Sequence, residues 1–315
     1  MEYRSLGKTG ISVSRLCMGT LTVGPVQGKL TVERGGEVIA HAIRRGVNFF
    51  DTAQLYETYP YLREAMHRSG RDDIVICSKT YAYTAELARE AVEQARRELD
   101  RDYIDIFLLH EQESIHTLRG HREALEVLYD YKAKGVIRAV GASMHHVAAV
   151  EGAVETGLDV IHPLLNVEGL GIVDGGRLEM EAAVEKAHDA GIGVFGMKAL
   201  GGGNLFRRGE ECLRYAFGLS FLDSVALGMQ SEEEVDADVE FAERGSFSAG
   251  AADYLAGRER RLHIDDWCTG CGSCAARCGQ GALRVEGGMA RCEHSRCVLC
   301  GYCATVCPEW AIKVI

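Results

Sequence analysis

Eight cysteines near the end of the chain have the spacing of iron–sulfur ligands. They form two runs of the pattern C-x2-C-x2-C-x3-C, and Pro308 follows the second run. The runs comprise Cys268, Cys271, Cys274 and Cys278, then Cys297, Cys300, Cys303 and Cys307. Thiolates bind zinc as well as iron–sulfur clusters, but zinc sites are usually built from two C-x2-C pairs. A third and a fourth cysteine in each run therefore favour [4Fe–4S] clusters.

The spacing also predicts how the cysteines are shared. In runs of this kind the fourth cysteine binds the cluster that the other run holds. We expect one [4Fe–4S] cluster on Cys268, Cys271, Cys274 and Cys307, and a second on Cys297, Cys300, Cys303 and Cys278. The C-x3-C-x2-C triplet of radical S-adenosylmethionine chemistry is absent. The other cysteines are scattered and are expected to be small apolar residues: Cys17, Cys77, Cys212 and Cys292.

Four polar residues much earlier in the chain suit a second kind of chemistry. Reduction of a carbonyl places negative charge on its oxygen, so an acid must supply a proton there. Tyr56 is such an acid once the ammonium of Lys79 lowers its pKa, and the carboxylate of Asp51 keeps that ammonium charged and oriented. His110 can hydrogen-bond the substrate oxygen. We therefore expect these four residues to act together.

The elements that must position these residues follow a repeating pattern. Apolar runs alternate with helical stretches such as the one in which Leu87, Val92, Ala95 and Leu99 share a face. The runs cover 15–20, 47–52, 73–79, 103–110, 137–143, 160–166, 192–198 and 224–228. Continuous runs of this kind are typical of parallel strands that are covered on both sides. Eight repeats predict an α/β fold, a (β/α)8 TIM barrel, in preference to an open doubly wound sheet.

The strand ends then define a common site, because active sites of TIM barrels lie at the C-terminal ends of the strands. Asp51, Lys79 and His110 each stand at such an end, and Tyr56 follows closely. Ser231 and Glu234 form a capping box that begins the last barrel helix. We expect the barrel to cover residues 1–245, a tether 246–261, and a small α+β iron–sulfur unit 262–315.

Composition excludes several classes of function. The net charge is −11, from 35 basic and 46 acidic residues, and there is no basic stripe for nucleic acid. No apolar run reaches the roughly 18 residues of a membrane span, and the first ten residues have no apolar signal core. Twelve cysteines without a secretion signal indicate metal binding in a cytoplasmic protein instead of a disulfide framework.

Several stretches resemble known families. YRSLGKTGISVSRLCMGT, DTAQLY, CSKT, DIFLLH, GVIRAVGAS and ALGMQSEEEVD resemble the aldo-keto reductase family in order and spacing, over about residues 3–243. Residues 262–315 resemble a bacterial ferredoxin with two clusters, although Gly279 stands where a proline often follows. The resemblance implies the iron–sulfur branch of the reductase family, with Asp51, Tyr56, Lys79 and His110 as the catalytic tetrad and Tyr56 as general acid.

The resemblance also implies a nicotinamide cofactor and the residues near it. In the family a Ser-Asn pair holds the carboxamide, whereas here Met144 follows Ser143. The expected cofactor contacts are Ser143, Asn166, Lys198, Gly201, Gly202, Gly228 and Ser231. Three glutamates at 232–234 replace the cations that would hold a 2′-phosphate, so we expect NAD(H) in preference to NADP(H). His145 and His146 are expected to be ordinary residues at a helix start, and the sequence leaves a flavin open.

Three functions fit these features. The first is an oxidoreductase acting on a carbonyl or hydroxyl group of a small molecule, with electrons passing through the clusters from a redox partner such as a ferredoxin or flavoprotein. The second is a ferredoxin-type electron carrier or docking protein with a non-catalytic barrel. The third is an NAD(H)-dependent reductase whose clusters are structural staples. The intact tetrad favours an enzyme over a carrier.

Overall fold

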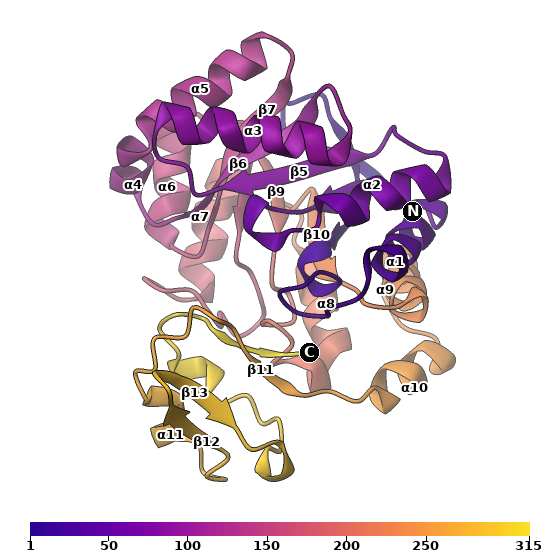
Figure 1. Cartoon of the computed structure of the whole chain (residues 1–315), viewed down its shortest axis with the longest axis vertical. Helices are drawn as coiled ribbons and strands as arrows, with labels where there is room; N and C mark the ends of the chain where they lie inside the picture. The colour runs from indigo at the N-terminus through magenta and orange to yellow at the C-terminus, as the bar shows by residue number, and fades with distance from the viewer.

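The computed structural model describes all 315 residues and contains a closed barrel of eight parallel strands (Figure 1). The barrel strands are β3 (Leu16–Gly19), β4 (Phe49–Asp51), β5 (Val75–Thr80), β6 (Ile104–Gln112), β7 (Ile137–Met144), β8 (Val160–Pro163), β9 (Gly193–Gly196) and β10 (Ser224–Gly228). Neighbours pair in chain order, and β10 closes the ring on β3. The predicted (β/α)8 fold is confirmed.

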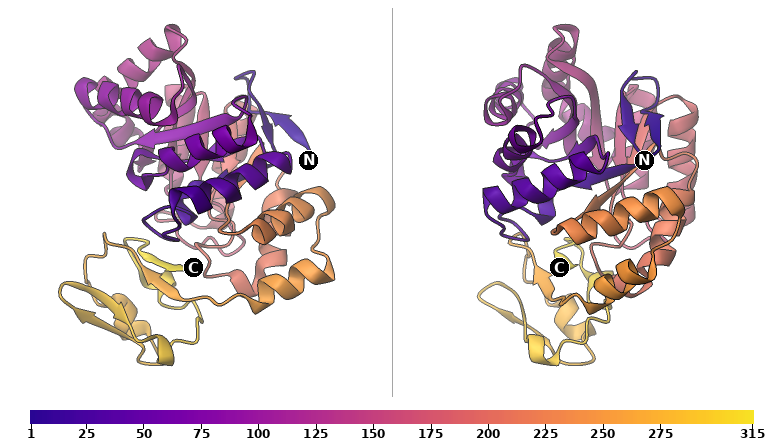
Figure 2. Two further views of the ribbon diagram at one scale, coloured as in Figure 1. Left: turned by 45° about the vertical axis from the view of Figure 1, so that its right-hand side comes forward. Right: turned by 90° about the vertical axis from the view of Figure 1, so that its right-hand side faces the viewer.

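Helices follow the strands around the outside of the barrel (Figure 2). They are α1 (Val32–Arg44), α2 (Tyr59–Ser69), α3 (Ala85–Leu99), α4 (Ile115–Gly120), α5 (Arg122–Ala133), α6 (Val147–Thr156), α7 (Arg177–Asp189), α8 (Gly209–Gly218) and α9 (Glu232–Arg244). In α3 the buried stripe is Ala88, Ala91, Val92, Ala95 and Leu99. The expectation that Leu87 joins it is wrong, because Leu87 lies in the first turn with 40% of its surface exposed.

The core has two parts, one between strands and helices and one inside the barrel. The inner part includes Cys17, Cys77 and Phe195, together with residues of a hairpin that precedes the barrel. That hairpin pairs β1 (Tyr3–Ser5) with β2 (Ser12–Ser14). Burial raises the pKa of the Cys17 and Cys77 thiols well above their usual range, so both behave as apolar core residues as expected. None of the helices combines the length and apolar character that a membrane crossing requires.

The cysteine-rich unit lies at one end of the barrel (Figure 2). The chain reaches it through α10 (Ala249–Gly257), which packs on α9. The unit contains β11 (Leu262–Ile264), α11 (Ser273–Arg277), β12 (Leu283–Glu286), β13 (Met289–Cys292) and β14 (Ile312–Val314). Strand β14 pairs with β11 and returns the end of the chain to the barrel, where the amide of Val314 donates to Gly202 O at 3.0 Å.

Candidate active site and cysteine-lined cavities

Lys79 and Asp51 form a buried ion pair between neighbouring strand ends. Lys79 Nζ donates to Asp51 Oδ1 at 2.5 Å and to Thr52 O at 2.8 Å. The side chains are only 1% and 8% exposed, so water screens the pair weakly. Burial is the largest influence and lowers the pKa of Lys79, but the Asp51 carboxylate together with Tyr56 and Cys77 outweighs it, so the pKa lies above its ordinary value. Lys79 is therefore held as a charged ammonium.

Tyr56 lies beside this pair. It ends a short 3-10 turn, Gln54–Tyr56, that directly follows β4. The ammonium of Lys79 lies 4.9 Å from the centroid of the Tyr56 ring. Burial raises the pKa of Tyr56, and Lys79 acts against that rise without reversing it. The expected net lowering is thus not found, because burial outweighs the Lys79 ammonium, which donates its hydrogen bonds to Asp51 and Thr52.

His110 completes the group of four predicted residues. Its Nε2 lies 3.4 Å from the Tyr56 hydroxyl, and the two rings meet edge to face at 74°. The pKa of His110 lies well below its ordinary value, because of burial first and the Lys79 and Lys198 ammonium groups second. The imidazole is therefore neutral. A long contact of this kind leaves a substrate oxygen able to bind both the hydroxyl and Nε2.

Two aromatic residues at this site, Tyr81 and His162, were not predicted. Tyr81 stacks on His110 with ring centroids 4.4 Å apart, and its hydroxyl donates to Glu111 Oε2 at 2.5 Å. His162, within β8, places Nε2 3.8 Å from Asp51 Oδ2 while its Nδ1 donates to Phe195 O at 2.6 Å. Burial lowers the pKa of His162 to about 4. The signal available in the sequence was a histidine inside an otherwise apolar strand.

Ser143 and Asn166, expected at a nicotinamide carboxamide, are both buried and already bonded. Ser143 Oγ accepts from the amide of Glu111 at 2.9 Å. Asn166 Nδ2 donates to Leu170 O at 2.9 Å, and Asn166 Oδ1 accepts from the amides of Glu168 and Leu170. The Asn166 side chain therefore shapes its own loop.

The glycine-rich loop after β9 contacts the C-terminal strand. Gly202 O accepts from Val314 N, and Asn204 Nδ2 donates to Ile312 O at 3.1 Å. A Cβ on Gly203 would fall 1.9 Å from Val314 O, so only glycine permits this approach. Gly201 and Gly202 also have positive φ. Strand β14 is hydrogen-bonded to this loop and fixes its conformation.

The start of α9 is covered by the segment that follows it. Ser231 caps α9 by accepting from Glu234 N at 3.2 Å, and its hydroxyl also lies 2.8 Å from the Tyr254 hydroxyl of α10. Arg258 Nε pairs with Glu234 Oε1 at 3.0 Å. Gly228, at the end of β10, packs directly against the Thr22 side chain. Ser231 is therefore buried by the chain's own contacts, whereas Gly228 contacts Thr22 and stays exposed.

Lys198 joins the barrel rim to the cysteine-rich unit. It adopts φ 61°, which is uncommon outside glycine, and its Nζ lies 2.7 Å from His145 Nε2. Nζ also lies 5.5 Å from the ring centroid of Trp310, whose ring is approached by Lys313 Nζ from 4.7 Å. Burial, with Lys313 second, lowers the pKa of Lys198 to about 7. His146 is the N-cap of α6 as expected, whereas His145 is buried in this contact.

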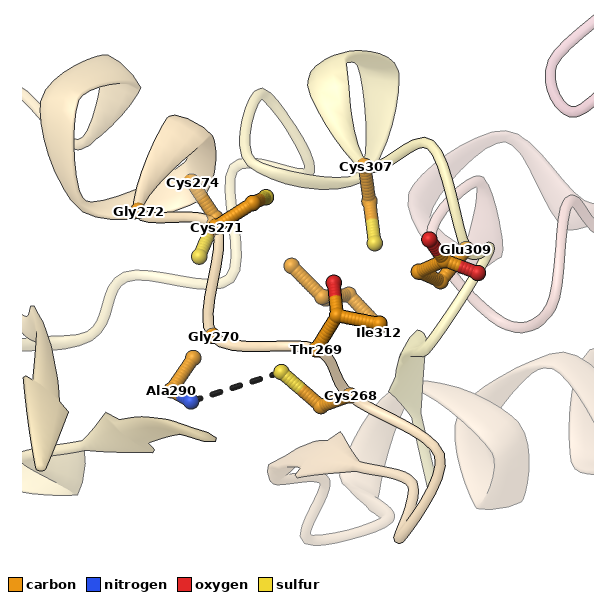
Figure 3. Close-up of a pocket in the computed structure, with 10 residues that line it drawn as sticks. All are labelled: Cys268, Thr269, Gly270, Cys271, Gly272, Cys274, Ala290, Cys307, Glu309 and Ile312. Atoms are coloured by element: carbon orange, nitrogen blue, oxygen red, sulfur yellow. Dashed lines mark hydrogen bonds between the residues drawn. The ribbon is translucent and has the colours of Figure 1, made fainter. Parts of the chain in front are cut away.

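The cysteines line two separate cavities. One contains Cys268, Cys271, Cys274 and Cys307 on its wall (Figure 3). The other contains Cys278, Cys297, Cys300 and Cys303. No set of three or more His, Cys, Asp or Glu side chains is arranged to hold a single metal ion. Each cavity thus gathers three cysteines of one run and the last cysteine of the other.

Backbone amides donate hydrogen bonds to three of the cysteine sulfurs. Ala290 N donates to Cys268 Sγ at 3.4 Å, and Ala311 N donates to Cys307 Sγ at 3.3 Å. In the second cavity Ala282 N donates to Cys278 Sγ at 3.3 Å. Amides in this position stabilise thiolates and are among the features that tune cluster potentials. Cys292 is half-buried beside Cys297 and lines neither cavity.

The fold and the two cavities define a TIM-barrel protein with an appended 4Fe–4S binding unit. The model of the aldo/keto reductase family matches residues 15–212, more than half of the sequence, and a 4Fe-4S binding domain model matches 293–313. The chain belongs to the aldo/keto reductase family.

Similar proteins agree with this assignment. L-galactose dehydrogenase of Arabidopsis thaliana is 24% identical over 280 residues, which cover 76% of this chain and 87% of that protein. Aldo-keto reductase YhdN of Bacillus subtilis is 31% identical over 159 residues, 45% of this chain and 47% of that protein. A solved aldo-keto reductase of Pseudomonas aeruginosa superposes with a TM-score of 0.67 at 23% identity, covering 77% of this chain and 95% of that one.

Proposed function

We propose that this chain is an oxidoreductase that interconverts a carbonyl and a hydroxyl group of a small molecule at the barrel mouth. The observation that carries the proposal is the contact of the Tyr56 hydroxyl with neutral His110 Nε2 at 3.4 Å, directly beside the buried Lys79–Asp51 pair. A substrate oxygen bound between hydroxyl and imidazole has a proton donor and an orienting group within reach. Reduction adds two electrons and two protons across the C=O bond, and Tyr56 supplies the proton that goes to oxygen.

Lys79 and Asp51 support Tyr56 electrostatically. Because burial disfavours tyrosinate, the phenol needs a nearby positive charge when it gives up its proton. The Lys79 ammonium, 4.9 Å from the Tyr56 ring centroid, supplies that charge, and Asp51 keeps it in place.

His110 is proposed to orient the substrate. A neutral imidazole donates or accepts one hydrogen bond at Nε2 without placing a full positive charge beside Lys79. Its stacking on Tyr81, and the bond from Tyr81 to Glu111, fix the ring. The group at the mouth therefore has a proton donor, an electrostatic support and an orienting residue on neighbouring elements.

We propose that the C-terminal unit holds two [4Fe–4S] clusters, one in each cysteine-lined cavity. The donor sets support this proposal, because each cavity is lined by four cysteines, three from one run and one from the other. Clusters of this type supply one-electron transfer when bound. The proposed unit boundaries are 1–245 for the barrel, 246–261 for the tether and 262–315 for the cluster unit.

The surface near the cavities supports docking of a small redox partner protein, such as a ferredoxin or flavoprotein. Cys271 and Cys300 are exposed at the cavities, so a carrier can approach either of them closely. Val298 and Tyr302 nearby expose 51% and 58% of their surface. Exposed apolar side chains beside a cofactor site are typical of weak electron-transfer interfaces.

The experiment that tests the proposed function is turnover of the anaerobic holoprotein against a panel of aldehydes, ketones and sugars, with a reduced viologen dye as the electron donor. Tyr56→Phe should reduce turnover of any accepted substrate by about 10²–10⁴-fold, because the proton donor is removed. Tyr83→Phe is the matched control, since Tyr83 is 60% exposed. Equal activity of both variants would remove Tyr56 from the mechanism.

A further inference from the structure

Phosphate groups in TIM barrels are commonly bound by the loops after the seventh and eighth strands and by a helix N-terminus. In this chain those places are the loop after β9, the loop after β10 and the start of α9. We infer that the C-terminal segment of the chain itself occupies this face, so that the site at the barrel mouth works without a nicotinamide dinucleotide. The inference concerns the reductant of that site and rests on the proposed function for the chemistry there.

The loop after β9 is occupied by the C-terminal strand of the chain. Strand β14 lies along it through the bonds from Val314 to Gly202 and from Asn204 to Ile312. The space that a Cβ on Gly203 would need is filled by the Val314 carbonyl. The lack of a side chain at these glycines therefore lets the chain's own backbone approach closely. The same lack of a side chain would admit a pyrophosphate.

At the start of α9 two backbone amides are bonded within the chain, while Gly228 at the end of β10 stays exposed. Glu234 N is bonded to Ser231 Oγ, and Gln230 N donates to Glu234 Oε2 at 2.7 Å. These amides are no longer available to a phosphate, and three glutamates in the first turn oppose its charge. Tyr254 and Arg258 then cover Ser231 and Glu234 from the outside.

Trp310 fills the rim between the loops after β8 and β9. A Cβ on Gly171 would fall 2.7 Å from the Trp310 ring, and a Cβ on Gly202 would fall 3.5 Å from the same ring. Trp310 itself has φ 51° and is only 7% exposed, so the backbone accepts an uncommon conformation to hold the indole there. Lys198, an expected cofactor contact, faces this indole instead of open space.

The same contacts join the cysteine-rich unit to the barrel mouth. Trp310 follows the cavity residue Cys307 by three positions, and its amide donates to Cys307 O at 3.3 Å. Trp310 and β14, which cover the loop after β9, are therefore part of the unit proposed to bind clusters. The reductant class that this arrangement suits is a one-electron carrier protein, which delivers two electrons singly for each carbonyl reduced, while Tyr56 protonates the oxygen and water supplies the proton added at carbon.

The test uses the anaerobic holoprotein and two probes, NADH and NADPH. Each is titrated by calorimetry to about 1 mM, near the upper end of ordinary Michaelis constants. Hydrogen exchange of residues 198–205 and 228–235 is followed with and without dinucleotide. A nicotinamide-dependent aldo-keto reductase run in parallel is the positive control. We expect no saturable binding and no protection of either segment.

Two outcomes would overturn the inference. One is saturable binding of NADH or NADPH that protects both segments. The other is a Trp310→Ala variant whose exchange in 198–205 equals that of wild type, since Trp310 would then not hold the loop; Val285→Ala, an exposed position in the same unit, is the control. Binding without protection of these segments would place the dinucleotide elsewhere and leave the inference standing. Loss of turnover in Tyr56→Phe is independent of all three results, so a failure here is distinguishable from a failure of the proposed function.

Discussion

The ammonium of Lys198, just past the end of barrel strand β9, lies 5.5 Å from the ring centroid of Trp310, three residues after Cys307. Its other close contact is the neutral acceptor His145 at 2.7 Å. No carboxylate is hydrogen-bonded to this lysine, so burial is opposed only at longer range and its pKa falls to about 7. The charged form of Lys198, at the link between the barrel and the C-terminal unit, therefore destabilises the folded chain.

Lys198→Met should remove that cost. The pKa of Lys198 is lower in the folded chain than the usual value of about 10.4, so between about pH 7 and 10 the unfolded chain binds more protons and stability rises with pH. The penalty is fully present below about pH 7. The variant should be more stable than wild type by about 1–3 kcal/mol near pH 7, and the difference should vanish near pH 10.

Anaerobic denaturant unfolding of both proteins at several pH values measures this difference. Lys186→Met is the control, because Lys186 lies exposed on α7. A constant offset between Lys198→Met and wild type across the pH range would contradict the prediction.

Asp51→Asn should damage both stability and the pH dependence of activity. Removing one partner of a buried pair costs about 3–5 kcal/mol, because Lys79 remains buried and uncompensated. The pKa of Lys79 then falls, because burial is its largest influence and the Asp51 carboxylate no longer opposes it, so the alkaline limit of activity should move to lower pH. Asp130→Asn, which breaks the exposed pair with Lys134, should cost less than about 1 kcal/mol and leave the profile unchanged. An unshifted alkaline limb in Asp51→Asn would contradict the assigned role.

His110→Phe should keep the stacking on Tyr81 and remove the Nε2 contact to Tyr56. We expect kcat/KM to fall by about 10–100-fold, because the substrate oxygen loses its orienting bond. Since the pKa of His110 lies well below its ordinary value, the wild-type profile should show no inflection near pH 6.5. A wild-type inflection there that disappears in the variant would show that His110 titrates during turnover.

Cys307→Ser and Cys292→Ser test the assignment of ligands. Cys307 lines the cavity of the first run, whereas Cys292 lines neither cavity. Iron analysis should give about eight irons per chain for wild type and Cys292→Ser, and about four for Cys307→Ser. Zinc in place of iron, or iron loss in Cys292→Ser, would contradict the assignment of the eight cysteines as cluster ligands.

The barrel and the grouping of the cysteines around two cavities were predictable because both follow from local patterns. Apolar runs mark buried parallel strands wherever they lie, and cysteine spacing is read within a few residues. The contact of His162 with Asp51 was not predictable in this way, since it requires the relative positions of two strands across the barrel interior. The packing of Trp310 and Val314 on Gly171 and Gly202 joins residues more than 100 positions apart, and no local pattern marks it.

The glycine-rich loop after β9 permits a close backbone contact as predicted, but the segment that makes this contact is β14. Gly201 and Gly202 were expected to approach a cofactor, because glycine permits a close backbone contact. The structure places β14 in that contact. Sequence reasoning identified the property of the loop, while the identity of what approaches it depended on the fold of the distant C-terminal unit.

The most direct measurement is a single-turnover experiment without any nicotinamide. The holoprotein is reduced with dithionite, separated from excess reductant and mixed with an accepted carbonyl substrate, and the alcohol is quantified. We predict about one alcohol per two electrons stored in wild type, and formation of that alcohol about 10²–10⁴-fold more slowly in Tyr56→Phe. Alcohol formed only after NADH or NADPH is added would contradict the account.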